Sequence, residues 1–207
     1  MGKISRLVNE RKVKTQLHGA KRKQSKPAPS SDWKPTTIPP DFTLVIDTRE
    51  QLPLFSKDRY TTRADCTYIP IIHRDVEIGD YTVLGFENMI AIERKMQSDF
   101  ESYISSEYQS KTIVKLESLS NCWFSGLVIE ANEYDLCEFP ISPKMTREKT
   151  RNHLASINSH YGIHTYINSD RGQIERWVLD RLVRVYNYLR NGDIERPKTL
   201  EEVMGEK

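Results

Sequence analysis

The sequence predicts an α/β domain with a mixed β-sheet and helices on both faces, preceded by a disordered basic tail. From residue 41 onward, short apolar, β-branched runs alternate with longer stretches of helical periodicity, as is typical of a sheet covered by helices. Two of the runs flank a four-residue turn near the start, which predicts an antiparallel hairpin and hence a mixed sheet. We therefore expect a tail and linker over 1–40, a folded domain over 41–192 and a polar C-terminal tail over 193–207.

The expected strands are short runs rich in Val, Ile, Leu and Tyr. They cover residues 43–47, 67–72, 81–84, 89–93, 123–130 and 163–168. The second run contains Pro70, which cannot donate a hydrogen bond to a central ladder, so we expect this strand at a sheet edge. The third and fourth runs flank Gly85-Phe86-Glu87-Asn88, and we expect them to pair as the hairpin.

Three helices are expected from capping residues and apolar spacing. They run over about 99–120, 142–160 and 174–192. The first follows Ser98, which is a suitable N-cap, and the second begins at Ser142-Pro143, an N-cap followed by a proline of the first turn. The third carries an apolar residue at every third or fourth position, which predicts a long amphipathic helix that ends near Gly192.

Charge is unevenly distributed along the chain. Of 31 Lys and Arg residues and 29 Asp and Glu residues, ten basic and two acidic ones fall in residues 1–40, which gives this segment +8 and the remainder −6. Five of the ten prolines lie in 27–40, where they oppose helix formation. A basic tail attracts phosphate backbones without reading sequence. Lys21, Arg22 and Lys23 are therefore candidate DNA contacts, and a solvated leader that keeps the protein soluble is the alternative.

Composition argues against several classes of protein. No stretch reaches the roughly 20 apolar residues of a membrane span, and the N-terminus lacks the apolar core of a secretory signal. The three cysteines, Cys66, Cys122 and Cys137, are widely spaced and odd in number. This spacing predicts buried thiols in a reducing compartment rather than disulfides or a zinc site.

Acidic residues stand at the expected strand ends and helix starts. Asp80 opens one strand of the expected hairpin and Glu93 closes the other, so their side chains are expected side by side, roughly 4.5–5.5 Å apart. Lys95 shares the strand face of Glu93, whereas Arg94 points the other way. A carboxylate pair with a nearby lysine suits metal-assisted phosphodiester hydrolysis, because carboxylates hold hard cations such as Mg²⁺ through oxygen. An isolated Glu-x-Lys also occurs on solvated strands, so the spacing alone leaves both interpretations open.

The wider pattern resembles a known signature. Gly79-Asp80, twelve residues, Glu93-Arg94-Lys95, three residues and Asp99 read GD-x(12)-ERK-x(3)-D. This pattern is similar to the motif of the XPF-type structure-specific endonuclease family, whose nuclease domain has a restriction-endonuclease-like fold. Upstream, Asp47-Thr48-Arg49-Glu50 resembles the D-x-R-E element of the same family. The resemblance covers about residues 42–190 and is densest over 44–104.

The resemblance implies a metal-dependent endonuclease that uses Mg²⁺ or Mn²⁺ to hydrolyse DNA at branched, flap or fork structures in repair, recombination or replication. It implies Asp80 and Glu93 as metal ligands and Lys95 as the catalytic lysine, and we expect Asp47 beside the metal as well. The remaining motif residues are expected to support the active site; they are Arg49, Glu50, Arg94 and Asp99.

Two features depart from the family pattern. Ser105-Ser106-Glu107-Tyr108 stands near the place of a usual Gly-Arg, so a phosphate-contacting arginine is expected to be missing. Only 15 residues follow Gly192, too few for the family's tandem helix-hairpin-helix domain. The chain therefore resembles the short form of bacteria and phages, which would be cytoplasmic and nucleoid-associated; a eukaryotic form would be nuclear. The family implies a homodimer or heterodimer, and no membrane partner is expected.

Other interpretations stay open. One is a non-catalytic DNA-binding or scaffold subunit that retains the nuclease fold, and another is a nuclease directed at RNA. Arg147 and Lys149, at the start of the second expected helix, are candidate DNA contacts or part of a solvated helix face. The same two interpretations apply to four arginines of the last helix, which are Arg171, Arg176, Arg181 and Arg184.

Overall fold

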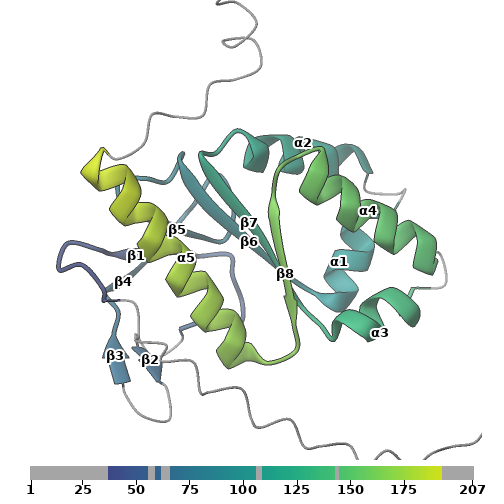
Figure 1. The fold of residues 1–207 in the computed structure, drawn as a ribbon, viewed down its shortest axis with the longest axis horizontal. Helices are drawn as coiled ribbons and strands as arrows, with labels where there is room; N and C mark the ends of the chain where they lie inside the picture. Colours follow the sequence, from purple (N-terminus) through teal and green to yellow (C-terminus); the bar gives the residue numbers. More distant parts are fainter. Residues whose placement is uncertain (1–36, 56–58, 62–65, 106–108, 143–144, 193–207) are drawn as a thin grey trace, which may run out of the picture. The chain divides into compact units, whose positions relative to one another are not determined.

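The computed structural model describes residues 37–55, 59–61, 66–105, 109–142 and 145–192. Six strands form one sheet in the order β4-β1-β5-β6-β7-β8, and β2 and β3 form a separate hairpin (Figure 1). The strands are β1 (Leu44–Asp47), β2 (Arg59–Thr61), β3 (Cys66–Tyr68), β4 (Ile71–Arg74), β5 (Tyr81–Val83), β6 (Ile90–Met96), β7 (Phe124–Glu130) and β8 (His164–Asn168). The helices are α1 (Gln97–Tyr103), α2 (Gln109–Ser120), α3 (Glu133–Glu138), α4 (Arg147–Ser159) and α5 (Arg171–Asn191).

The main sheet is mixed because β5 runs against both of its neighbours. Tyr81 of β5 lies opposite Ile46 of β1 on one side and opposite Ile92 of β6 on the other, in antiparallel register. The other neighbouring strands, β1 with β4, β6 with β7 and β7 with β8, are parallel. The expected α/β class with a mixed sheet and an antiparallel hairpin is confirmed.

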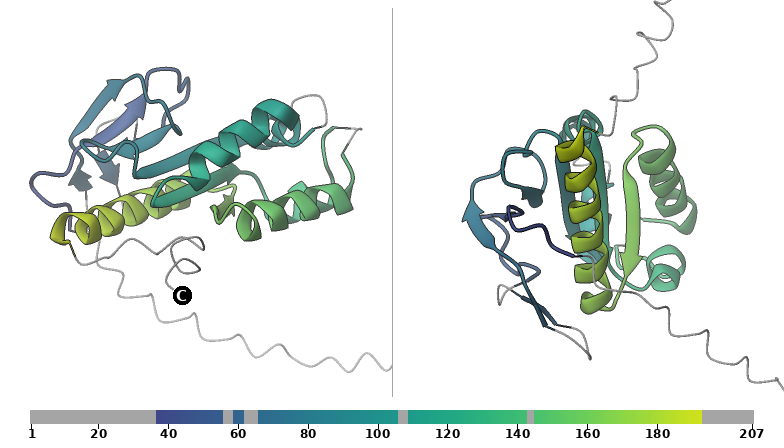
Figure 2. Two further views of the ribbon diagram at one scale, coloured as in Figure 1. Left: turned by 90° about the horizontal axis from the view of Figure 1, so that it is seen from above. Right: turned by 60° about the vertical axis from the view of Figure 1, so that its left-hand side comes forward.

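Helices cover both faces of the sheet. On one face α5 packs on β5–β8. Here the ring of Trp177 stacks on Tyr166 with centroids 5.2 Å apart. The same ring lies close to Gly126, where an added Cβ would be 3.1 Å from it. On the opposite face α1, α2 and α4 enclose a cluster of buried residues that includes Phe100 and Ile129. The right-hand view of Figure 2 shows α5 and α4 on opposite sides of β8.

Two strands differ from the expected ranges. The run 67–72 is divided at Pro70, whose carbonyl accepts a hydrogen bond from the amide of Leu44 at 2.9 Å. Its first part belongs to the β2–β3 hairpin, and its second part forms β4, which lies at a sheet edge as expected. β6 continues through Glu93 to Met96, because it pairs with β7 in parallel along its full length.

The helix expected over 99–120 is two helices. α1 begins at Gln97 without a side-chain cap, so Ser98 is not its N-cap. After α1 ends, the hydroxyl of Ser105 donates to the carbonyl of Ser102 at 2.8 Å, and the Ser105 amide donates to the same carbonyl at 3.1 Å. These short-range bonds replace the helical pattern, since serine side chains compete with the helix for backbone groups.

The region between β7 and β8 also differs from expectation. α3 was not anticipated; Asn132 caps it by accepting hydrogen bonds from two amides of its first turn. α4 begins later than predicted, because Thr146 rather than Ser142 acts as its N-cap and accepts from the Lys149 amide at 3.3 Å. α5 ends as expected before Gly192, which adopts a left-handed conformation with φ of 67°.

Some predictions lie outside the described residues. These concern the basic tail with Lys21, Arg22 and Lys23, the residue Pro143, the segment 106–108 and the C-terminal segment 193–207. Cys122 is buried, and burial raises the pKa of its thiol to about 11. Across the described ranges, no helix has the length and apolar character that a membrane crossing needs.

Candidate active site

Asp80 joins three strands of the sheet at the point where β5 begins. Its carbonyl accepts from the amide of Asp47 at 2.9 Å, and its amide donates to the carbonyl of Ile92 at 2.8 Å. Its carboxylate Oδ2 accepts from the amide of Arg94 at 2.7 Å, so a side chain takes the place of a strand carbonyl. These bonds bring the carboxylate of Asp80 to the part of β6 that carries the Glu93-Arg94-Lys95 motif.

The side chains of the β6 motif alternate between the two faces of the sheet. Glu93 and Lys95 point toward α1 and α2: the Lys95 ammonium donates to Glu93 Oε1, and Lys115 of α2 places its Nζ 2.6 Å from the same oxygen. Arg94 points the other way and pairs with Glu50 and with Glu130 of β7. This alternation agrees with the two-residue period of a strand.

The two carboxylate oxygens of Glu93 have different surroundings. Glu93 is fully buried, and its Oε1 accepts from both lysines. Its Oε2 is also buried and has no hydrogen-bond partner among the described residues. Leaving a buried acceptor unsatisfied costs about 1–3 kcal/mol, and more for a charged group. A cation beside Oε2 would remove this cost.

The surroundings of Asp80 also favour a cation. Burial raises the pKa of the Asp80 carboxyl to about 7, and the negative charge of Glu93 acts in the same direction. Lys95, the Arg94 amide and Lys115 oppose this shift but do not cancel it. Two neighbouring carboxylates that disfavour each other's charge are stabilised together by a hard cation held between them.

Lys95 is a partly buried ammonium beside this carboxylate pair. Burial acts to lower the pKa of Lys95, but the negative charges of Glu93, Asp80 and Asp99 outweigh it, so the pKa is raised. The ammonium also lies 5.7 Å from the ring centroid of Tyr103, within cation–π range. Lys95 is therefore a positively charged hydrogen-bond donor at neutral pH.

Asp47 is occupied by protein groups. Its Oδ1 accepts from the Arg49 amide at 2.7 Å and from Arg49 Nε at 2.9 Å, and its Oδ2 accepts from Arg49 Nη2 at 2.6 Å and from the Val76 amide at 3.1 Å. The side-chain hydrogen bonds from Arg49 are the main reason that the pKa of Asp47 falls to about 2. In this arrangement Asp47 holds Arg49 and the loop after β4 in place.

The carboxylates available to a metal ion are thus Asp80 and Glu93. Within the described residues, no group of three or more His, Cys, Asp or Glu side chains is arranged to hold a metal. Mg²⁺ is commonly bound by one or two carboxylates, with water and substrate phosphates as its other ligands. The pair and its unsatisfied oxygen fit such an ion, whereas Asp47 does not contribute a third free carboxylate.

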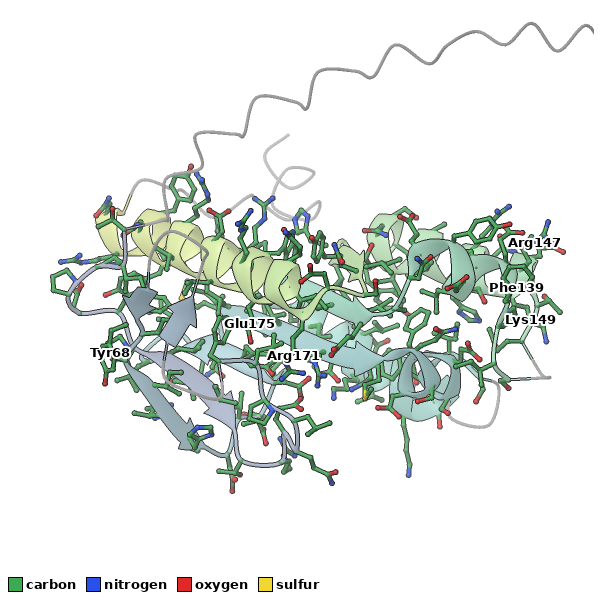
Figure 3. All side chains as sticks on the ribbon, turned by 90° about the horizontal axis from the view of Figure 1, so that it is seen from below. Tyr68, Phe139, Arg147, Lys149, Arg171 and Glu175 are labelled. Atoms are coloured by element: carbon green, nitrogen blue, oxygen red, sulfur yellow. The ribbon has the colours of Figure 1, made fainter. Side chains whose placement is uncertain are left out.

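Arg94 is held by a chain of ion pairs on the other face. Its side chain is 4% exposed, and Glu50 and Glu130 neutralise it. Arg171, at the start of α5, lies 3.6 Å from Glu130 and donates to the carbonyls of Leu52 and Pro53 at 2.8 and 2.6 Å. Figure 3 shows Arg171 and its neighbour Glu175 near the strands that carry the motif. The network ties the Asp47–Glu50 motif to β6 and α5.

Three cavities border Asp80 or Lys95, whereas Glu93, which is fully buried, lines none of them. Asp80 lines two of them, of about 470 and 320 Å³. A third, of about 260 Å³, lies between α1 and α2. Lys95 and Asp99 line the second and third cavities, and Lys111 and Lys115 line the first and third. The site is therefore reachable from outside and is bordered by lysines.

Sequence reasoning missed several residues of this site. Lys115 and Glu130 were not singled out, and Arg171 was considered only as a DNA contact or a solvated residue. A signal for Lys115 existed, because Lys111 and Lys115 are one helical turn apart and share a helix face. The sequence did not show that this face of α2 is directed at Glu93, because the direction of α2 depends on the break between α1 and α2.

Arg147 and Lys149 lie in the first turn of α4, away from this site. Arg147 is exposed and pairs with Glu138 of α3 at 2.5 Å. Neither residue lines the three cavities around Asp80 and Lys95. Figure 3 shows both near Phe139, on the part of the chain that α3 and α4 form.

Comparisons with known proteins identify a similar fold. No protein-family model and no curated protein sequence matches the chain. Among solved structures, XPF from Aeropyrum pernix in complex with DNA matches with a TM-score of 0.51 at 18% identity, covering 78% of this chain and 70% of that one. A second structure, XPF from Aeropyrum pernix, gives a TM-score of 0.49 at 18% identity and covers 70% of this chain. This chain spans 65% of that structure's length. The chain has an XPF-like fold.

Proposed function

We propose that this protein is a divalent-metal-dependent endonuclease that hydrolyses DNA phosphodiesters at branched, flap or fork structures. The observation that carries the proposal is the pair of Asp80 and Glu93, in which Glu93 is fully buried, its Oε2 has no partner among the described residues, and Lys95 supplies an adjacent ammonium. The XPF-like fold supports it, because the sequence motif that resembles the XPF-type nucleases lies at this site.

In this proposal Asp80 and Glu93 hold Mg²⁺ or Mn²⁺, and the carbonyl of Arg94, which lies 3.3 Å from Lys95 Nζ, is a further candidate ligand. An ion of this kind polarises a phosphodiester and lowers the pKa of bound water. The Arg94 amide fixes the orientation of Asp80 through its hydrogen bond to Oδ2. The pair of Asp47 and Arg49 braces the neighbouring strand end.

Lys95 acts as a cation and a proton donor. In the metal-free protein the negative charges of Glu93 and Asp80 raise the pKa of Lys95, so we assign it the part of an ammonium and not that of the base. Instead it orients the attacking water and offsets the negative charge that develops on the phosphate. Glu93 positions the ammonium by accepting its hydrogen bond.

The substrate class and the setting are part of the proposal. One structural neighbour is described as XPF in complex with DNA. A role in repair, recombination or replication, and action as a homodimer or heterodimer, follow from the resemblance of the motif. The competing interpretation is a DNA-binding subunit without catalysis, and the same experiment separates the two.

The experiment is cleavage of labelled duplex, flap, fork and junction DNAs in Mg²⁺, in Mn²⁺ and in EDTA, with matched RNA substrates. We expect metal-dependent cleavage of at least one branched DNA by the wild type, and none in EDTA. Lys95→Ala should abolish cleavage while DNA binding survives. Arg190→Gln, which removes an exposed charge of α5 paired with Asp41, should cleave like the wild type. Tight DNA binding without cleavage by the wild type would favour the non-catalytic subunit.

A further inference from the structure

Helix α2 presents two lysines to the active site, and the sequence motif does not account for either of them. Lys111 and Lys115 are one turn apart on the same face of α2. Lys115 Nζ lies 2.6 Å from Glu93 Oε1, although Glu93 already pairs with Lys95. The carboxylate is thus supplied with a second ammonium that the proposed metal site does not need for its own charge balance.

Lys115 is not enclosed by its contact with Glu93. Its side chain is 41% exposed, whereas that of Glu93 is fully buried. A lysine ammonium has three N–H donors, and one directed at Glu93 leaves others for a ligand on the open side. Lys111 is exposed as well, and within the described part of the chain no ion pair engages it.

The two lysines border two cavities beside the carboxylate pair. They line the 470 Å³ cavity together with Gly79 and Asp80, and the 260 Å³ cavity together with Lys95. The second cavity also has hydroxyl-bearing side chains on its walls, which are Ser102, Tyr103 and Thr112. Pockets for whole small molecules start at about 300 Å³, so a space of this size suits a compact group.

Three ammonium groups around one compact space favour an anion, and lysines bind phosphate as point charges. The hydroxyls of Ser102 and Thr112 already donate to the carbonyls of Ser98 and Tyr103, so the lysines are the donors that such an anion would use. Because the space adjoins the pair at which a phosphodiester would be cut, the anion suited to it is another phosphate of the same strand. A free carboxylate ligand would be repelled by Asp80, Glu93 and Asp99 and would have no further contacts to offset this repulsion. A phosphate of a bound strand is also held by the contacts of its neighbouring nucleotides.

We propose that Lys111 and Lys115 of α2 bind a backbone phosphate of the DNA strand next to the scissile position. The inference rests on the proposed function for the choice of DNA as the ligand. It makes Lys111 and Lys115 of α2 a phosphate-binding site, here called the phosphate grip, beside the active site. Lys115 then has two partners, Glu93 on the buried side and the phosphate on the open side.

The test is DNA binding rather than cleavage. The affinity of full-length protein for a labelled flap DNA is measured by fluorescence anisotropy from 50 to 200 mM salt, in Ca²⁺ and again in EDTA, with a gel check that the DNA stays uncut. The variants are Lys111→Gln, Lys115→Gln, Lys115→Arg and the double glutamine variant. Arg190→Gln is the matched control, because it removes an exposed positive charge from another helix.

We expect each glutamine variant to weaken binding by about fivefold to tenfold near 0.1 M salt. The double variant should lower the slope of log affinity against log salt by about 0.7 to 0.9 for each phosphate that the protein no longer neutralises. Lys115→Arg should keep the wild-type slope, because it keeps the charge. Arg190→Gln should match the wild type in affinity and slope.

Wild-type affinity and slope in Lys111→Gln and in the double variant would overturn the inference, and so would wild-type protein that fails to bind the DNA. Lys111→Gln is decisive because it leaves the contact between Lys115 and Glu93 in place. Failure of the proposed function is a separate outcome: the wild type would bind DNA with lysine-dependent affinity but cut no DNA in Mg²⁺ or Mn²⁺. Cleavage by the wild type together with unchanged DNA binding in the lysine variants would contradict the phosphate-binding role of Lys111 and Lys115 and leave the proposed function standing.

Discussion

The backbone amide of Arg94 donates a 2.7 Å hydrogen bond to Oδ2 of Asp80. This contact joins the two halves of the motif, which lie on β6 and at the start of β5. It fixes the orientation of one carboxylate through a backbone group, which among substitutions of Arg94 only proline would remove. The position of Asp80 therefore depends on the backbone of its neighbours, and Gly79 is the neighbour on which a test can be made.

Gly79→Ala should damage both stability and the site. Gly79 has a φ of 79°, and an added Cβ would lie 3.1 Å from the carbonyl oxygen of Ile92. We expect the free energy of unfolding to fall by about 1–3 kcal/mol, because a side chain adds strain at this φ and displaces β6. Cleavage should fall with it. Urea denaturation and the flap assay measure the two effects.

Gly85→Ala is the matched control for this substitution. Gly85 has a φ of 83°, but a Cβ there would have no neighbour within 4 Å. It should show the conformational cost alone, with cleavage retained. If the two alanine variants lost equal stability and cut equally well, the close approach of Gly79 to β6 would have no role.

Asp47→Asn should destabilise the protein by about 1–3 kcal/mol at pH 7, because the buried carboxylate loses its ionic hydrogen bonds with Arg49. The pKa of Asp47 is lowered to about 2 from its ordinary value of 3.8, so its stabilising effect is fully present above about pH 4 and is lost as the pH falls toward 2. The difference in urea midpoint between wild type and variant should thus shrink from pH 6 to pH 3. A difference that stays constant over this range would contradict the assigned role of Asp47.

Asp80→Asn should stabilise the metal-free protein at pH 8. The raised pKa of Asp80, about 7, means that the folded state takes up a proton more readily than the unfolded chain. The wild type should therefore gain stability as the pH falls through 7 toward 4, and the variant, which has no charge at this position, should lack this gain. We expect an advantage of about 1–3 kcal/mol for the variant at pH 8 in EDTA.

Thermal unfolding at pH 8 and pH 5.5, in EDTA and with excess Mg²⁺, measures this effect. The advantage of Asp80→Asn should be smaller at pH 5.5 than at pH 8. Mg²⁺ should stabilise the wild type more than the variant, because a ligand that binds only the folded state raises its stability. A wild type more stable than the variant in EDTA at pH 8 would show that the negative charge of Asp80 does not destabilise the metal-free protein.

Glu130→Gln should cost about 1–3 kcal/mol, because it removes one of the two carboxylates that neutralise the buried Arg94. Glu87→Gln is the control: its partner, Arg74, is 46% exposed, and ion pairs of this kind contribute about 0–1 kcal/mol. Urea denaturation of the two variants gives the comparison. Equal losses would mean that the Arg94 network is no more important than a surface pair.

The sequence predicted those parts of the fold that depend on local pattern. The apolar runs at β1, β7 and β8 and the amphipathic repeat of α5 follow from residue spacing, and the structure has them close to the expected ranges. The turn expected after β5 also predicted that Asp80 and the β6 motif would lie together, and the structure pairs β5 with β6 as expected. The break between α1 and α2 was not predictable in this way, because it depends on serine side chains that bond their own backbone.

The rest of the site depends on which surfaces pack together. Lys115 reaches Glu93 because α2 packs on that face of the sheet, where it contacts β7, and Arg171 reaches Glu130 because α5 begins beside the end of β7. Residue spacing places Lys111 and Lys115 on one helix face, but it does not show what that face contacts. The engagement of Asp47 by Arg49 and Val76 is also a tertiary contact, and it occupies both oxygens of the third carboxylate expected at the metal, whose role there stays a prediction.

The most direct measurement of the central claim is a calorimetric titration of the metal-free protein with Mn²⁺, for the wild type and for Glu93→Gln. We expect saturable binding by the wild type, and affinity at least about tenfold weaker in the variant, which loses the negative charge of the Glu93 carboxylate. Circular dichroism establishes that the variant is folded. Equal Mn²⁺ affinity in the two proteins, or no Mn²⁺ binding by the wild type, would contradict the assignment of this carboxylate pair as a metal site.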